Sequence, residues 1–303
     1  MTTPRIVVIG GGLMGMGIAQ VFAVAGHQVC VVEPVDTVRS TLASRLRDGI
    51  AQLGADAAAA DRLETSADLG SAVAAAAYVT EAVPERLELK RAIFDELIKR
   101  APRTAILASN TSVIPIGRIA AGLDTADRII GTHWWNPAPL IPLVEVVQAV
   151  GTSDSTVAAT MAMLQSIGKQ PAHVKKDLPG FVANRLQHAL WREAIAMVAE
   201  GVCDARTLDE CVKNSFGLRL PVLGPLENAD LVGLDLTLDI HRTVIPALDR
   251  HDGPNELLEE YVAAGRLGFK TGEGFRTWTT DEMTATRLRL LQHLLRAQRE
   301  RTA

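Results

Sequence analysis

Residues 5–15 read RIVVIGGGLMG, and this stretch decides the fold. Its apolar, β-branched start predicts a buried strand over 5–9, and the pattern after it predicts a helix over 16–25 that a glycine at 26 ends. A G-x-G-x-x-G sequence between strand and helix is typical of dinucleotide binding, because glycines allow the tight turn, the approach of a pyrophosphate and close helix packing. We therefore expect this turn to bind a dinucleotide through Gly10, Gly12, Leu13, Met14 and Gly15.

The second predicted strand indicates which dinucleotide is bound. Residues 28–32, QVCVV, are apolar, and Glu33 follows them about 20 residues after the glycines. A carboxylate at this place accepts hydrogen bonds from the adenosine ribose and repels a 2′-phosphate. Arg39 is the nearest cation and weakens this preference only slightly. The sequence therefore predicts NAD rather than NADP.

Composition excludes several classes of protein. The 303 residues suffice for two domains, and the net charge of −4 is spread along the chain without the basic stripe of a nucleic-acid-binding protein. No apolar run reaches membrane-spanning length, and the N-terminus does not resemble a signal peptide. The three cysteines lack metal-ligand spacing. We expect a cytoplasmic protein that binds no metal, nucleic acid or membrane.

The order of predicted elements indicates two domains. Strands and helices alternate in the first part, which is typical of a Rossmann-type, doubly wound, mostly parallel α/β sheet. Only helices follow from Phe181 onward. We expect an NAD-binding domain over 1–179 and a smaller all-α domain over 180–303. The further predicted strands span 78–83, 105–108, 128–131 and 142–147, and the further predicted helices span 38–53, 89–98, 181–200, 207–215, 227–250, 255–264 and 280–299.

A histidine and a glutamate follow this pattern at informative places. His133 ends a predicted strand at the sheet edge where ligands bind in open α/β folds, and Glu145 interrupts the next apolar strand. A buried carboxylate needs a partner, and a carboxylate-bound imidazole has a fixed tautomer and raised basicity. The alternatives are a structural histidine bound to the backbone and a glutamate whose charge reaches solvent. Because the chain also carries a dinucleotide-binding motif, we favour the interpretation that His133 is a catalytic base.

Two further segments carry polar groups suited to this edge. Residues 109–112, SNTS, follow a predicted strand, so Ser109 and Asn110 are expected to contact the nicotinamide ribose; the alternative is that Ser109 or Thr111 caps a short helix near residue 115. Asn184, early in the first helix after the domain boundary, can face the cleft. Arg185 is either a substrate carboxylate anchor or part of an interdomain ion pair.

Six motifs in order resemble the L-3-hydroxyacyl-CoA dehydrogenase family over nearly the whole chain. They are the glycine motif, SNTS at 109–112, His-x-x-Asn-Pro at 133–137, the glutamate at 145, KDLPGFVANR at 176–185 and GFKTGEGF at 268–275. The resemblance implies that His133, paired with Glu145, is the catalytic base. It also implies a homodimer formed through the helical domain. By the same resemblance, substrate is oriented by Ser112, Asn184 and Asn136, and NAD is contacted by Glu33, Glu81 and Lys90.

Within the family, the chain looks closer to compact members that do not use CoA, namely the carnitine, gulonate (lambda-crystallin) and pyridoxine-breakdown dehydrogenases. In acyl-CoA members a long basic hairpin helps to hold the CoA nucleotide, whereas residues 34–77 here are shorter and contain no lysine. We therefore expect NAD-dependent oxidation of a secondary hydroxyl β to a carboxyl-type group in a compact 3-hydroxy acid.

Three alternative functions remain to be weighed. The first is a true (S)-3-hydroxyacyl-CoA dehydrogenase of fatty-acid oxidation. The second is a non-enzymatic NAD-binding structural protein, against which the pairing of His133 with Glu145 argues. A dehydrogenase of the 6-phosphogluconate type lacks support, because the His-x-x-Asn-Pro segment is not its signature. The candidate anchors for a substrate carboxylate are Arg185, Arg192 and Arg219.

Overall fold

The computed structural model describes residues 5–302, which form two compact units. The first unit runs to Arg185 and takes in the chain again from His293, and the second spans Leu186–Gln292. Within the described residues, no helix is long and apolar enough to cross a membrane.

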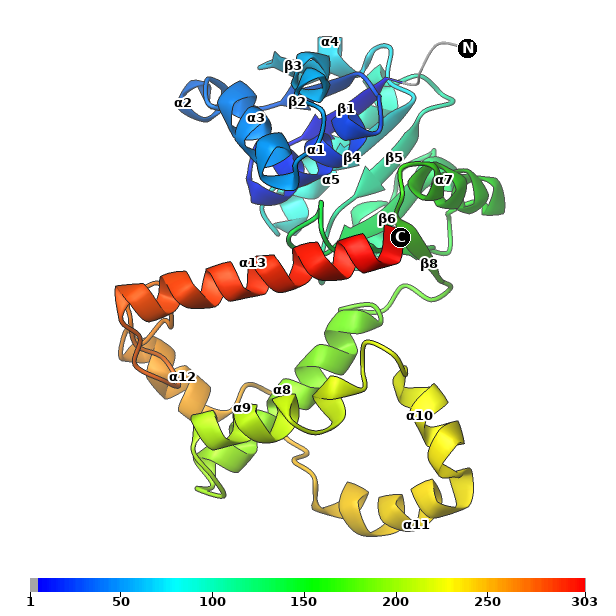
Figure 1. The fold of residues 1–303 in the computed structure, drawn as a ribbon. Helices are drawn as coiled ribbons and strands as arrows, with labels where there is room; N and C mark the ends of the chain where they lie inside the picture. Colours follow the sequence, from blue (N-terminus) through cyan, green and yellow to red (C-terminus); the bar gives the residue numbers. More distant parts are fainter. Residues whose placement is uncertain (1–4, 303) are drawn as a thin grey trace. The chain divides into compact units, whose positions relative to one another are not determined.

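The first unit is built on one eight-stranded sheet, shown in Figure 1. Its strand order is β3-β2-β1-β4-β5-β6-β7-β8, and every neighbouring pair is parallel except the antiparallel pair β6–β7. The predicted Rossmann-type sheet is therefore confirmed. The strands are β1 (Ile6–Ile9), β2 (Val29–Val32), β3 (Leu63–Ser66), β4 (Tyr78–Glu81), β5 (Ile106–Ser109), β6 (Ile129–Trp134), β7 (Leu143–Val147) and β8 (Gln170–Val174).

Helices cover both faces of this sheet because its central strands are apolar on both sides. In β1, Ile6 and Val8 pack with α1, α3 and α7 on one face, whereas Val7 and Ile9 pack with α4, α5 and α6 on the other. Burial of each large apolar side chain stabilises the fold by roughly 1.5–3 kcal/mol. These helices are α1 (Leu13–Val24), α3 (Leu42–Leu53), α4 (Leu69–Val73), α5 (Leu87–Arg100), α6 (Ile116–Ile119) and α7 (Asp154–Ser166).

Two predicted helices are each broken in the structure. The helix expected over 38–53 is divided into the short α2 (Asp36–Arg39) and α3, and the one expected over 227–250 into α10 (Pro225–Val232) and α11 (Leu234–Val244). The second break falls at Gly233, whose φ of 104° lies in the region that favours glycine. Four further helices complete the chain, namely α8 (Ala183–Ala199), α9 (Ala205–Lys213), α12 (Glu256–Ala263) and α13 (Thr280–Thr302).

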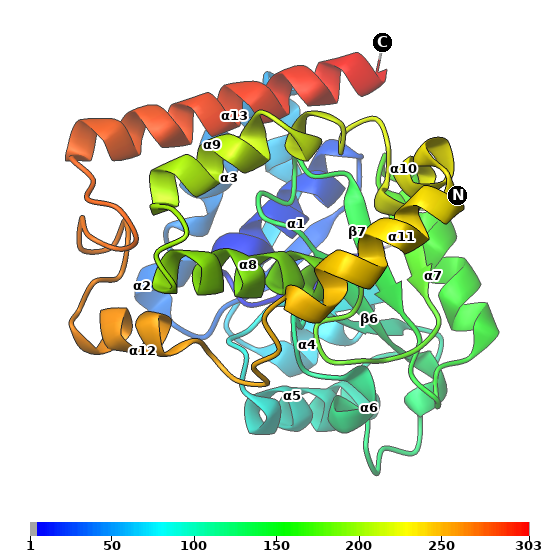
Figure 2. The same ribbon diagram turned by 90° about the horizontal axis from the view of Figure 1, so that it is seen from below.

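The second unit is helical, and its helices α9 to α12 can be followed in Figure 2. Two of them, α10 and α11, leave many large apolar side chains exposed. A water-soluble helix normally buries such residues against a partner, so this apolar surface favours association. The exposed residues are Leu226, Leu231, Val232, Leu234, Leu236, Leu238, Ile240 and Val244.

Candidate active site

The glycine turn fits the phosphates of a dinucleotide. Gly10 has a φ of 103°, and a Cβ added at Gly15 would stand 1.9 Å from the Gly10 carbonyl oxygen, so neither position accommodates a side chain. A Cβ at Gly12 would instead meet nothing within 4 Å. The open backbone at Gly12 and the first turn of α1 can therefore receive a pyrophosphate, which the unpaired N–H groups and the helix dipole attract.

Glu33 lies directly against this turn. One of its carboxylate oxygens, Oε2, accepts a hydrogen bond from Gly11 N at 2.9 Å, and the other accepts from Val35 N at 3.0 Å. The nearby cation Arg39 donates to Asp36 at 2.6 Å and to the Glu33 carbonyl oxygen at 2.8 Å. The carboxylate therefore lies where the adenosine ribose of a bound dinucleotide is expected, and Arg39 is held by its own neighbours.

His133 and Glu145 are joined across the antiparallel strands. They lie directly opposite each other in β6 and β7, and His133 Nδ1 is 2.7 Å from Glu145 Oε2. Both are buried, at 4% and 1% exposure. The rings of Trp135 and Phe181 lie beside the imidazole, with centroids 5.3 and 5.6 Å from its own. His133 is therefore bound to a carboxylate rather than to the backbone, and the charge of Glu145 does not reach solvent.

The second oxygen of Glu145 binds the start of α8. It accepts hydrogen bonds from Val182 N at 2.9 Å and Ala183 N at 3.0 Å. Burial raises the pKa of Glu145, but the hydrogen bonds from His133, Ala183 and Val182 together hold this pKa below its ordinary value. An ionised Glu145 accepts the Nδ1 hydrogen, which leaves the Nε2 lone pair of His133 without a partner among the described residues.

The Ser109–Asn110 segment is fixed by a buried ion pair. Ser109 Oγ donates to Glu81 Oε2 at 2.6 Å, and Lys90 Nζ donates to Glu81 Oε1 at 2.8 Å, with both charged side chains fully buried. Asn110 Oδ1 accepts from Trp134 N at 2.9 Å. The expected contacts of Glu81 and Lys90 with NAD stay a prediction. As a buried ion pair, these two residues hold Ser109 in place at this edge of the sheet.

Glu85, which the sequence analysis did not single out, holds the following loop. It accepts a hydrogen bond from the Thr111 hydroxyl and from the backbone N–H groups of Ser112 and Val113, at 3.0 and 3.1 Å. Burial raises the pKa of Glu85, but the hydrogen bond from Thr111, the charge of Lys90 and the backbone hydrogen bonds from Val113 and Ile114 lower it overall. Its only sequence signal was a carboxylate just past the end of β4.

The structure shows how the 109–112 segment and Arg185 are bound within the first unit, and Thr111 Oγ1 also accepts a hydrogen bond from Ile114 N at 3.0 Å, just before α6. Neither Ser109 nor Thr111 caps α6, because Pro115 occupies the N-cap and their side chains bind Glu81 and Glu85. Arg185 donates to the Pro179 carbonyl oxygen at 3.3 Å and makes no ion pair within the described residues.

Of the remaining predicted residues, Ser112 and Asn184 lie together in the first unit. Asn184 Nδ2 donates to the Ser112 carbonyl oxygen at 3.2 Å, so these two residues lie together, while the Asn136 side chain is exposed. Of the other two candidate anchors, Arg192 lies 3.5 Å from Asp249, and Arg219 is exposed. Among the described residues, no group of His, Cys, Asp or Glu side chains has a geometry that could hold a metal ion.

Comparison with known proteins agrees with the resemblance. The family model for the NAD-binding domain of 3-hydroxyacyl-CoA dehydrogenase matches residues 5–178, and that for its C-terminal domain matches 180–278. The chain belongs to the 3-hydroxyacyl-CoA dehydrogenase family. Its cofactor is NAD, and it is a dehydrogenase that acts on CH–OH groups, as predicted.

Members of this family with different substrates are similar to the chain. The 5-formyl-3-hydroxy-2-methylpyridine 4-carboxylate 5-dehydrogenase of Mesorhizobium japonicum is 33% identical over 97% of both chains. A solved structure of an enzyme of this name, described as an NAD+-dependent dismutase, has a TM-score of 0.89, 32% identity and 98% coverage of both chains. A probable 3-hydroxybutyryl-CoA dehydrogenase of Bacillus subtilis is 38% identical over 91% of this chain and 97% of its own.

Proposed function

We propose that the chain oxidises a secondary hydroxyl β to a carboxyl-type group of a compact substrate, with His133 as the base. The observation that carries this proposal is the buried pair of His133 and Glu145 at 2.7 Å, with Nε2 of the imidazole left as an acceptor. A base with a fixed tautomer and a carboxylate behind it suits removal of a hydroxyl proton.

Different residues of the chain carry out proton transfer and substrate orientation. His133 Nε2 takes the hydroxyl proton, and the positive charge that forms on the imidazole is stabilised by Glu145. NAD bound at the glycine turn would supply the hydride acceptor for the carbon that bears this hydroxyl. Ser112 and Asn184, which lie together, orient the reacting oxygen, and the exposed amide of Asn136 supports the substrate.

The segment after β2 supports a substrate smaller than acyl-CoA. Residues 34–77 contain four arginines, three of which are held by the protein itself. Arg39 binds Asp36, Arg45 donates to the Gly11 carbonyl oxygen at 2.7 Å, and Arg62 donates to the Ala23 carbonyl oxygen at 2.8 Å. A phosphorylated adenosine would find little available positive charge there.

A compact acid still requires a carboxylate anchor. Of the three candidate arginines, Arg185 is the one in the same compact unit as His133, and it directly follows Asn184. Its bond to the Pro179 carbonyl oxygen leaves guanidinium N–H groups that a carboxylate can accept from. We infer that Arg185 anchors the substrate. The pyridine carboxylate named for the M. japonicum relative is a compact acid of this kind.

A substrate screen tests the proposal. We expect free 3-hydroxy acids to be turned over with NAD more efficiently than 3-hydroxyacyl-CoA thioesters. The H133A variant should bind NADH nearly as the unaltered protein does but lose turnover, since only transition-state interactions are removed. Efficient oxidation of 3-hydroxybutyryl-CoA alone would support the acyl-CoA alternative and contradict the compact substrate. Near-normal kcat in H133A would place the base elsewhere.

A further inference from the structure

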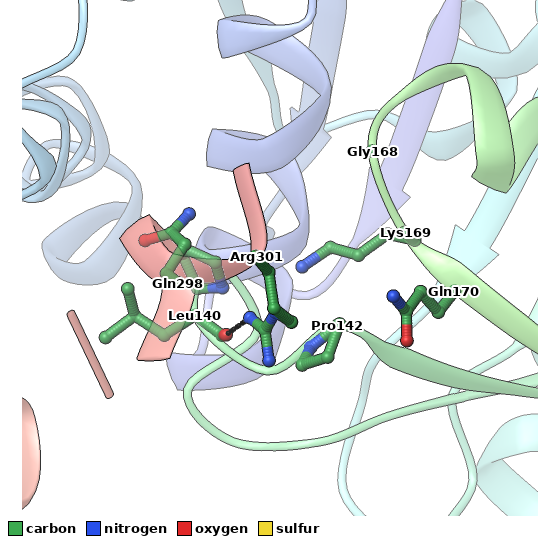
Figure 3. A pocket seen from close by; sticks show the side chains of 8 residues that line it. Leu140, Pro142, Gly168, Lys169, Gln170, Gln298 and Arg301 are labelled. Carbon is green, nitrogen blue, oxygen red and sulfur yellow. Dashed lines mark hydrogen bonds between the residues drawn. The ribbon is translucent and has the colours of Figure 1, made fainter. Parts of the chain in front are cut away.

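A small pocket in the first unit, shown in Figure 3, has neither His133 nor Glu145 among its lining residues. It has a volume of about 130 Å³ and is formed by the loop after β6, the turn before β8 and the end of α13. Roughly 10–15 Å³ suffices for one water, so the pocket has room for a polyatomic ion. Its polar side chains come from Lys169, Gln170, Gln298 and Arg301.

Lys169 is the buried member of this pocket. It is 7% exposed, and its Nζ donates to the carbonyl oxygens of Ala138 at 2.5 Å and Ile141 at 2.9 Å. The ammonium group also stands 5.5 Å from the centroid of the Trp134 ring. All of these partners are uncharged. Since a buried ammonium normally pairs with an anion, Lys169 lacks the partner that its burial calls for.

Arg301 brings a second positive charge to the same space. Its guanidinium donates to the Leu140 carbonyl oxygen at 3.3 Å, and Figure 3 shows the Lys169 and Arg301 side chains extending into the pocket from different elements. Within residues 5–302, neither cation forms an ion pair with a carboxylate. Burial, and then the charge of Arg301, lower the pKa of Lys169 to about 8. The two cations are therefore near enough to repel each other.

We propose that the Lys169–Arg301 pocket binds a phosphate group, either as the free ion or on a small metabolite. A phosphate supplies the anionic partner that both cations lack. Its oxygens can accept hydrogen bonds from the paired N–H groups of the Arg301 guanidinium and from the one ammonium N–H of Lys169 that does not bind a carbonyl oxygen. The amides of Gln170 and Gln298 also line the pocket, from different elements. Arg301 lies beyond residue 278, where the family match ends, so the family likeness assigns it no role.

The occupied pocket would stabilise the loop that carries Asn136. Lys169 and Arg301 hold three carbonyl oxygens of this loop, those of Ala138, Leu140 and Ile141. An anion between the cations removes their mutual repulsion and strengthens their hold on the loop. The site is independent of the proposed substrate, so its test does not require turnover.

The test is calorimetric titration of inorganic phosphate into NADH-saturated protein at constant ionic strength, because bound dinucleotide blocks the glycine turn. We expect one phosphate per chain and a phosphate-dependent rise in the melting temperature that potassium chloride does not reproduce. R301Q should weaken the binding at least about tenfold. R289Q removes the same charge from an exposed position on α13 and should leave binding unchanged. K169M should abolish binding, and R301Q keeps the test decisive if K169M fails to fold.

Adenosine 3′,5′-bisphosphate distinguishes the two sources of the phosphate. If it competes with inorganic phosphate in the unaltered protein but not in R301Q, the pocket takes a nucleotide phosphate; if it does not compete, the pocket takes the free ion. Equal phosphate binding in R301Q and the unaltered protein, or no binding up to about 10 mM phosphate, would overturn the proposal.

Discussion

Replacement of Glu145 by glutamine changes one buried group while almost preserving its volume. In the structure, one carboxylate oxygen accepts from Val182 N and Ala183 N and the other accepts from His133 Nδ1. The amide oxygen of glutamine has to stay with the two N–H groups, so its NH2 group faces His133. Nδ1 then accepts a hydrogen bond, Nε2 carries the hydrogen, and the base is in the wrong tautomer.

The size of the effect follows from the bonds that are lost. A hydrogen bond to a charged group contributes about 1.5–3 kcal/mol, and this one matters most when the imidazole becomes charged. Forcing the productive tautomer against the amide costs a similar amount, so the barrier rises by about 3–6 kcal/mol. This corresponds to a kcat between about 10²-fold and 10⁴-fold lower, since each 1.36 kcal/mol is a factor of about ten.

The assay is kcat at saturating NAD with the best substrate of the screen, with NADH affinity and melting temperature measured in parallel. E145Q should bind NADH within about twofold of the unaltered protein. E96Q, the same change at a surface ion pair on α5, is the matched control and should leave kcat unchanged. A kcat of E145Q within about threefold of the unaltered value would refute the role of Glu145, because less than about 0.7 kcal/mol would then depend on it.

Four other predictions follow from the same structure. NAD should exceed NADP in kcat/KM by more than about tenfold, and E33A should narrow this gap; equal use of both cofactors by the unaltered protein would contradict the assignment. Because the folded pKa of Glu145 lies below its ordinary value, its stabilisation is complete above the unfolded pKa of about 4.3 and is lost as the pH falls through the folded pKa. Chemical denaturation between about pH 5 and pH 3 should therefore show a steeper loss of stability for the unaltered protein than for E145Q. E85Q should weaken the Thr111–Val113 loop and lower kcat roughly tenfold while the fold survives, since one charge-assisted set of hydrogen bonds becomes neutral; an unchanged kcat would remove Glu85 from the site. The apolar surface of α10 and α11 should form a homodimer, and sedimentation of a monomer at micromolar concentration would contradict this.

The sheet could be predicted where its strands are buried on both faces. Strands such as β1 and β2 are continuous apolar runs, so they stand out in the sequence. The missed strands β3 and β8 are the two edges of the sheet, where one neighbour is absent and polar residues such as Glu64 and His173 are exposed. Periodicity carries no signal for such strands.

The site divides in a similar way. The pairing of His133 with Glu145 could be predicted, because a lone carboxylate in an apolar strand requires a partner. The role of Glu85 depends on a loop that returns to it from 26 residues further along the chain, and no local pattern encodes that return. The burial of Lys90 could not be foreseen either, since a helix surface rarely encloses an ammonium group completely.

Because the two oxygens of the Glu145 carboxylate bind different parts of the chain, catalytic activity also depends on the folding of α8. The oxygen that binds Val182 N and Ala183 N completes the first turn of α8, and the oxygen beside it selects the tautomer of His133. If that turn opens, the carboxylate loses two donors and is free to rotate away from the imidazole. If the first turn of α8 frays at residue 183, the protein would still bind its dinucleotide at the glycine turn but would be catalytically inactive. Incompletely folded copies would fail to react rather than react with the wrong hydroxyl.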